Sequence, residues 1–276
     1  MKNALGSMAL LAIAAAIAPQ VFGQSVAQVR ALPRSGSFSI TNEYSKETSD
    51  KGAFLDSASV TRTAAGTFAG RALSAAATLS TQARDFKDVH KNADSMGLNL
   101  NYGLSNNTEL FGRLRRTNAD GKEFDALNVS AAVSLGGVQL AGANAALQGK
   151  LNDYKSTDLD IGVRYFFPTD TSFKPYVAPS VGISRVDAIQ LQFLSFRGTN
   201  TLARSLNFYN ASNAYRYGLN VGFRYDVARN VAIGLETGLQ YQQKLSANSE
   251  DLGDYKTNSS GKRSYIPLTI GVNIAF

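Results

Sequence analysis

The feature that most constrains this chain is a period of two in its apolar residues, which recurs from about Met96 onward. In DLDIGVRYFF, AYRYGLNVGFRYDV and VAIGLETGLQYQ, almost every second residue is Leu, Ile, Val, Phe or Tyr, with polar or small residues between. Successive side chains of a strand point to opposite faces, so this period predicts β-strands with one apolar and one polar face. No later segment has the roughly 20 apolar residues of a transmembrane helix, so a membrane location requires a closed barrel.

The polar face of these strands has the composition of an enclosed surface. A face in contact with water would carry many Lys, Glu and Asp side chains, whereas this one is rich in Gly, Ala, Ser and Asn, with isolated Arg and Glu. Small residues and paired charges suit a closed polar interior, and terminal Tyr and Phe residues on the apolar face suit a membrane–water interface. The chain has no Trp, so Tyr must serve there. A soluble barrel is the alternative, because it too has two unlike faces.

Connections of two lengths alternate along the chain. Reading back from residue 276, a long polar segment at 246–262 comes before a short turn at 228–230, and a second long segment at 187–213 before a short turn at 168–173. Short turns at one end and long loops at the other are typical of outer-membrane barrels. We therefore predict an all-β fold, an antiparallel up-and-down transmembrane β-barrel.

The stretch from about Met96 to Phe276 resembles the bacterial outer-membrane β-barrel family of the OmpA-like transmembrane domain type. The segments that carry the likeness are YGLSNNTELFGRL, DLDIGVRYFF, FKPYVAPSVGISRV and TIGVNIAF. The resemblance implies insertion by the envelope assembly machinery, with short turns in the periplasm and long loops outside the cell. The final strand, SYIPLTIGVNIAF, also resembles the C-terminal assembly signal of such barrels, through Gly271, Val272, Ile274 and Phe276.

The pattern predicts eight strands. The first lies near residues 37–45, two follow near 97–104 and 108–116, and five are centred near 162, 181, 220, 236 and 270. Ten strands remain the alternative, because LNVSAAVSL in the region 124–150 alternates well and Gly136-Gly137 suits a hairpin turn. The segment 49–94 is too long for a simple loop. Within it, residues 70–85 suit a strand, a surface helix or the true first strand.

The N-terminal residues have the form of a secretory signal peptide. Lys2 precedes an apolar run over residues 8–18, which is too short to span a bilayer, and the sequence VFG ends at Gly23 before Gln24. We expect cleavage near Gly23-Gln24. The predicted organisation is a signal peptide at 1–23, a periplasmic lead at 24–36 and a barrel with long extracellular loops at 37–276.

Charged residues on the predicted polar face form the candidate site. They are Glu109, Arg113, Arg115, Asp158, Asp160, Arg164, Arg216, Arg224 and Glu236. These side chains either line a conducting pore or pair with one another and fill the lumen. With eight strands the side chains fill the interior, and unpaired buried charge costs several kcal/mol, so we favour a plugged lumen.

Catalysis is not expected. Nucleophilic or general-base chemistry needs a partner that titrates near neutral pH, and the one histidine, His90, lies between lysines in what we expect to be a solvated loop. The acidic loop with Glu250, Asp251 and Asp254 lacks the spacing of a calcium loop, so we expect neither metal nor cofactor. The apolar segment IQLQFLSFRG suits either a strand pair above the membrane or contact with lipid, a partner or a small hydrophobic ligand.

Composition narrows the partners. The formal net charge is +7, but the basic residues are scattered, which argues against nucleic acid and is compatible with lipid phosphates. There is no cysteine, so disulfides are excluded. We expect a monomeric outer-membrane protein that contacts lipid, lipopolysaccharide and the barrel assembly machinery, with a structural or surface-loop role such as envelope integrity or adhesion. The alternatives are a narrow channel for small or hydrophobic solutes and, less favoured, a lipid A-modifying enzyme.

Overall fold

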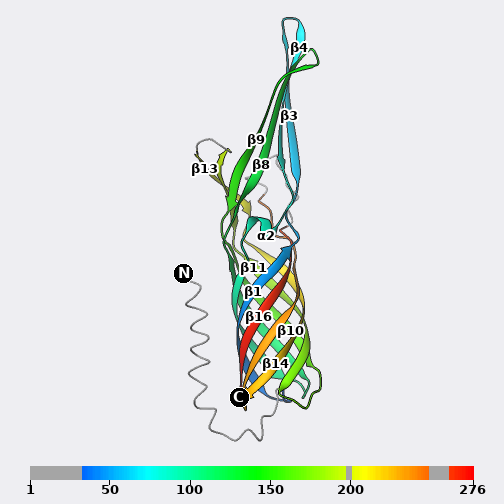
Figure 1. Ribbon diagram of the computed structural model, residues 1–276, viewed down its shortest axis with the longest axis vertical. Coiled ribbons are helices and arrows are strands. Elements are labelled where there is room, and N and C mark those ends of the chain that lie inside the picture. Colours follow the sequence, from blue (N-terminus) through cyan, green and yellow to red (C-terminus); the bar gives the residue numbers. More distant parts are fainter. Residues whose placement is uncertain (1–32, 197–200, 249–260) are drawn as a thin grey trace.

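The computed structural model describes residues 33–196, 201–248 and 261–276, and the predicted signal peptide lies outside these ranges. Eight strands close into an antiparallel barrel in the order β1-β16-β15-β14-β11-β10-β7-β6 (Figure 1). Their bounds are Phe38–Lys51 (β1), Asp94–Gly103 (β6), Thr108–Ala119 (β7), Tyr154–Phe166 (β10), Phe173–Val186 (β11), Ser212–Ala228 (β14), Val231–Gln242 (β15) and Arg263–Ala275 (β16). The prediction of eight strands is confirmed, and the ten-strand alternative is wrong.

The barrel is closed by its first and last strands. Tyr44 of β1 pairs with Ile270 of β16 on one side and with Met96 of β6 on the other. At the end of the barrel that holds Phe276, the connections 104–107, 167–172 and 229–230 are short. The connections at the opposite end are long, as the sequence predicts, but they are largely not irregular loops.

The long connections build a second sheet beyond the barrel, with the strand order β13-β12-β9-β8-β4-β3. The bounds are Ala58–Phe68 (β3), Arg71–Thr81 (β4), Glu123–Leu135 (β8), Val138–Leu151 (β9), Ile189–Phe196 (β12) and Thr201–Tyr209 (β13). We call β3, β4, β8 and β9 the blade, because they project far beyond the barrel (Figure 1). The alternative that residues 70–85 form the first barrel strand is wrong, because β4 pairs with β3 and β8.

The β8–β9 hairpin turns at a pair of glycines. Gly136 and Gly137 join the strands with φ values of 58° and 84°. Positive φ at both central residues is the requirement of the tightest hairpin turns, and glycine meets it without steric cost. The side chains on both faces of the outer half of β9 are exposed, so this segment encloses neither a lumen nor a core.

A short segment between the first blade hairpin and β6 covers the mouth of the barrel. It consists of β5 (Arg84–Asp85), which pairs with β2 (Ala53–Leu55), and the single-turn helix α2 (Phe86–Val89). Phe86 and Val89 are buried in a hydrophobic cluster with Phe54, Tyr154 and Tyr209, which we call the cap. Among the residues that the structure describes, no helix is both long and apolar enough to cross a bilayer.

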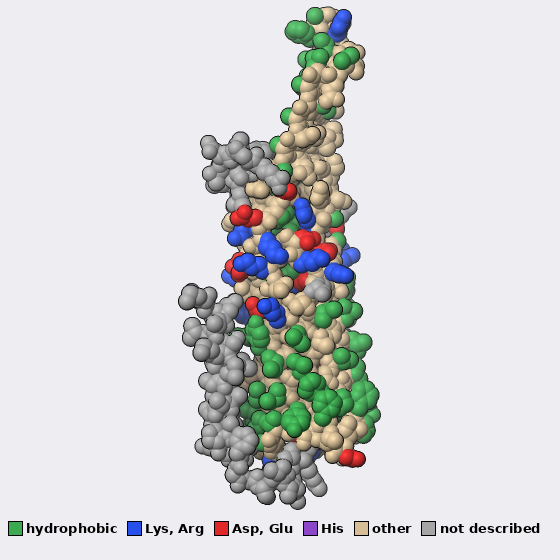
Figure 2. Space-filling model, viewed as in Figure 1, with side chains coloured by type: hydrophobic (Ala, Val, Ile, Leu, Met, Phe, Trp, Pro, Cys, Tyr) green, Lys and Arg blue, Asp and Glu red, His purple; other side chains and the backbone are tan. Residues whose placement is uncertain are grey.

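A belt of apolar side chains surrounds the barrel and is exposed on its outside. Leu100, Ile161, Leu219, Leu239 and Leu268 are each between 53% and 59% exposed. Figure 2 shows this green surface over the lower barrel, with a band of charged side chains directly above it. Because soluble proteins rarely expose a continuous apolar surface of this kind, the belt is the side that faces hydrocarbon, and the polar face is enclosed.

Candidate functional site: the ion-pair network of the barrel lumen

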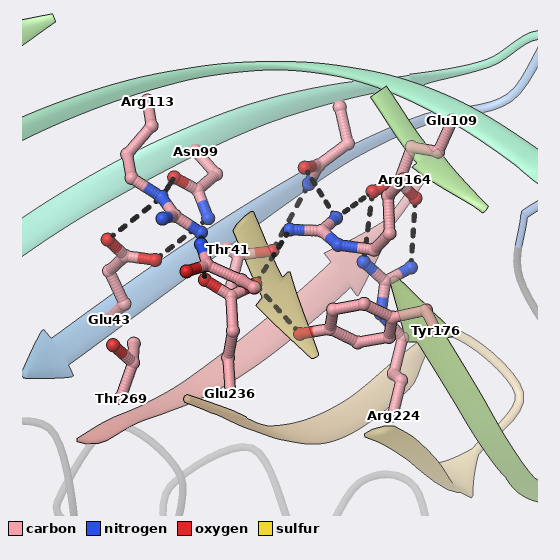
Figure 3. A network of polar contacts seen from close by, with 12 residues as sticks. Thr41, Glu43, Asn99, Glu109, Arg113, Arg164, Tyr176, Arg224, Glu236 and Thr269 are labelled. Carbon is pink, nitrogen blue, oxygen red and sulfur yellow. Dashed lines mark hydrogen bonds and ion pairs between the residues drawn. The ribbon is translucent and has the colours of Figure 1, made fainter. Parts of the chain in front are cut away.

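The structure places all of the charged residues predicted from the polar face inside the barrel. Each of them is at most 4% exposed. They lie on β7, β10, β14 and β15. Figure 3 shows the side chains of Glu109, Arg113, Arg164, Arg224 and Glu236 pointing toward one another. The network has successive layers between the end with the short turns and the cap.

The first layer is centred on Glu109 of β7. The guanidinium of Arg224 donates two hydrogen bonds to its carboxylate, at 3.0 and 3.1 Å, and Arg164 forms an ion pair with the same carboxylate. The Arg164 guanidinium also lies 4.8 Å from the ring centroids of Phe111 and Tyr176. Two cations therefore share one carboxylate, and aromatic rings give Arg164 additional electrostatic stabilisation.

The second layer links three walls of the barrel through Arg113. Its Nε lies 3.2 Å from Glu43 of β1, and its Nη2 lies 2.8 Å from Glu236 of β15. Glu236 also accepts hydrogen bonds from the hydroxyl of Tyr176 at 3.0 Å and the amide of Asn220 at 2.9 Å. Glu43 also accepts a hydrogen bond from Arg115 at 3.0 Å, so each carboxylate has more than one donor.

The third layer is centred on Arg216 of β14. Its Nη1 lies 2.5 Å from Asp158 and 3.6 Å from Asp160, two neighbouring lumen positions of β10. The Asp158 carboxylate also accepts a hydrogen bond from Ser184. Arg216 donates to the hydroxyl of Tyr265 at 2.5 Å, which links this layer to β16.

The layer next to the cap was not predicted from the sequence. Arg263 forms ion pairs with Glu47 and Asp50 of β1, and its guanidinium lies 3.7 Å from the centroid of the Phe86 ring. Glu43, described above, was also missed. Its alternation with Phe38, Ile40 and Tyr44 carried a usable signal, whereas Arg263 lies before the clear alternation of the last strand.

The network leaves little free space in the lumen. The cavity lined by its central residues, including Glu43, Arg113, Arg164 and Glu236, measures about 30 Å³. A cavity of that size has room for about two or three water molecules, because each needs roughly 10–15 Å³ on this measure. The charged side chains that line this cavity are thus paired across the lumen and fill most of the space between the strands at this level.

The structure corrects the prediction for His90, which is buried and not solvated. Its ring stacks on Phe86 at a centroid distance of 4.5 Å, and Nε2 lies 3.1 Å from the carbonyl oxygen of Asn152. Burial, together with the nearby cations Arg263 and Lys122, lowers the pKa of His90 from 6.5 to about 3. His90 is therefore neutral near pH 7 and acts as a packing residue of the cap.

Other candidate sites gain no support from the described residues. Residues 249–260, which include Glu250, Asp251 and Asp254, lie outside them, and elsewhere in the described ranges no group of three His, Asp or Glu side chains is placed to hold a metal. Of the apolar segment at 189–196, Ile189 and Leu191 are buried in the cap cluster. The strand-pair interpretation of this segment is therefore correct for β12 and β13.

Comparisons with known proteins reveal structural similarity only. No family model matches, and no curated protein matches by sequence. Among solved structures, the chain is similar to Neisserial surface protein A (NspA), with 12% identity, 89% of this chain and 100% of that chain covered, and a TM-score of 0.43. It is also similar to the outer membrane protein OprG from Pseudomonas aeruginosa, with 14% identity, 88% of this chain and 97% of that chain covered, and a TM-score of 0.40. A third similar structure is Ail, the attachment invasion locus protein of Yersinia pestis, with 11% identity, 88% of this chain and 99% of that chain covered, and a TM-score of 0.40.

Proposed function

We propose that the protein is a non-catalytic barrel of the bacterial outer membrane, with a sealed lumen, that presents the blade at the cell surface. The observation that carries this proposal is the combination of an exposed apolar belt with a lumen filled by ion pairs. The belt requires hydrocarbon around it, while the filled lumen is suited to anchoring and not to transport. The role is then envelope integrity or adhesion.

The blade supports a role in contact with other molecules. Its outer strand, β3, is an edge strand that pairs with β4 alone, and Arg62 is the one charged residue in its sequence. An exposed edge strand offers unpaired backbone N–H and C=O groups to an extended segment of another protein. We propose that the blade faces outward, because barrels of this kind keep their short turns in the periplasm.

Lipopolysaccharide is the membrane partner that the charge pattern favours. Lys46, Arg116, Lys155 and Arg185 are exposed on the outside of neighbouring barrel strands, beyond the apolar belt. Figure 2 shows basic side chains in the band above the belt. Cations at this level lie where lipid phosphates would meet them. The assembly machinery, recruited through Gly271, Val272, Ile274 and Phe276 of the last strand, remains the proposed biogenesis partner of a monomeric barrel.

Conductance in planar bilayers tests the sealed lumen. The purified barrel should give no stable ion steps, and heat-modifiable mobility of the same sample on gels should show that the barrel is folded. Stable steps from folded protein would instead favour the narrow channel.

Labelling on intact cells tests the orientation. The chain has no cysteine, so Ala65→Cys in β3 creates one reactive thiol in the blade, and Asp170→Cys provides the matched control in a short turn. A membrane-impermeant maleimide should label the first variant on intact cells and the second only after the outer membrane is opened. Labelling in the reverse pattern would contradict the proposed orientation.

A further inference from the structure

The cap and the second sheet border a partly open cavity of about 170 Å³ that lies outside the ion-pair network. Its walls come from β4, β8, β9, β12 and β13, together with Leu55 at the end of β2 and residues of the adjoining connections. Phe124, Phe193 and Leu206 pack against the cap cluster but are only partly buried. The packing of apolar side chains against the cap cluster is therefore incomplete beside these three residues, which also contact solvent.

The wall of this cavity is almost entirely apolar. Thr81 is the hydroxyl residue of the lining, and its Oγ1 accepts from the backbone N–H of Ala58 and donates to the carbonyl oxygen of Asp56. The hydroxyl is thus satisfied within the chain and has little to offer a ligand. The charged residue of the lining is Asp56, whose carboxylate disfavours an anionic molecule.

Protein interiors are close-packed, so voids of this size are few in a domain. Cavities of on the order of 150 Å³ that are lined by Leu, Ile and Phe stay dry and accept benzene. The present cavity has a similar volume and is lined mainly by Leu and Phe, with Asp56, Thr81 and Gln82 as its polar lining residues. We propose that it binds a neutral apolar molecule of about the size of benzene, on the blade side of the barrel. This site is independent of whether the lumen conducts ions.

Fluorescence of an introduced tryptophan tests this proposal, because the chain has no other Trp. Phe124→Trp places the reporter in the cavity wall, and bromobenzene serves as a heavy-atom quencher of the size that the cavity accepts. In the folded Phe124→Trp variant, tryptophan quenching should reach a plateau as the bromobenzene concentration rises. At low bromobenzene concentration, the quenching should be at least fivefold stronger than in two control variants. Phe68→Trp reports on the blade tip and Phe167→Trp on the belt, where partition into detergent gives unsaturable quenching.

A second change distinguishes binding from simple collision. Leu79→Phe, combined with the Phe124→Trp reporter, adds a ring to the cavity and should abolish the saturable component. The charged analogue 4-bromobenzoate should quench the reporter less than bromobenzene does. Unsaturable quenching, no effect of Leu79→Phe, or equal quenching by 4-bromobenzoate would each overturn the proposal. Unboiled gel mobility checks that every variant is folded, and Phe193→Trp is the second reporter if Phe124→Trp does not fold.

Discussion

Replacing Glu236 by glutamine should destabilise the barrel by about 3–5 kcal/mol, since one partner of a buried ion pair is lost while the other charge stays buried. In the structure, the Glu236 carboxylate accepts hydrogen bonds from Arg113 at 2.8 Å, Asn220 at 2.9 Å and Tyr176 at 3.0 Å. The hydrogen bond from charged Arg113 contributes about 1.5–3 kcal/mol to the free energy of unfolding, and each of the two neutral donors contributes about 1 kcal/mol. The sum lies in the same range. Glutamine keeps the shape but turns an amide donor toward cationic Arg113.

Urea unfolding in detergent micelles, followed by the mobility of the folded band on unboiled gels, measures this loss. The matched control is Asp120→Asn, which removes an ion pair with Lys91 at 3.2 Å whose side chains are 56% and 63% exposed. Such an exposed pair contributes at most about 1 kcal/mol, so the control should unfold near the native midpoint. If Glu236→Gln unfolds within about 1 kcal/mol of this control, the lumen network does not hold the barrel together as we argue.

Further predictions concern the cap, the barrel wall and the last strand. Because the pKa of His90 falls from 6.5 to about 3 on folding, the unfolded chain gains a proton below about pH 6.5 that the folded protein does not, and stability falls as pH drops toward 3. His90→Gln should therefore lose less stability than the native protein between pH 6.5 and 4, as measured by urea midpoints; equal losses would refute the assignment. Gly162→Val puts methyl groups into the ring of Phe111 and should lower the free energy of unfolding by about 1–3 kcal/mol, whereas Gly112→Val, facing open space outside the barrel, should be tolerated. Phe276→Ser should reduce the heat-modifiable fraction in cell membranes, while Phe167→Ser, in the same belt, serves as its control; equal fractions would argue against an assembly signal.

The barrel strands could be predicted from the sequence because lipid and lumen impose opposite polarity on successive residues. In β10, for example, Leu159, Ile161 and Val163 face outward, and Asp158 and Asp160 face inward, so the local pattern alone defines both faces. The pairing of the lumen charges was not predictable. Arg113 and Glu236 are on β7 and β15, and their contact depends on the stagger of the whole barrel.

The blade and the cap were predicted incompletely, for different physical reasons. The alternation in β8 and the Gly136-Gly137 turn suited a hairpin, but the pattern did not place it beyond the barrel. The outer half of β9 is exposed on both faces, so its sequence, rich in Ala and Gly, has no reason to alternate. His90 lies next to exposed Lys91, and this neighbourhood favours a loop in the sequence. Its spacing from Phe86 and Val89 follows one face of a helix, and this was the signal that could have revealed its burial.

The second sheet draws its hairpins from three separate connections of the barrel: β3–β4 from the first, β8–β9 from the second and β12–β13 from the third. Each hairpin can form from local sequence, but the ladders β4–β8 and β9–β12 join segments that come together only when their barrel strands are neighbours. We therefore expect this sheet to be completed only after the barrel strands that bring these segments together have paired. The shared pairing also means that the surface connections cannot diversify one at a time, because a residue inserted into β8 shifts its register against both β4 and β9.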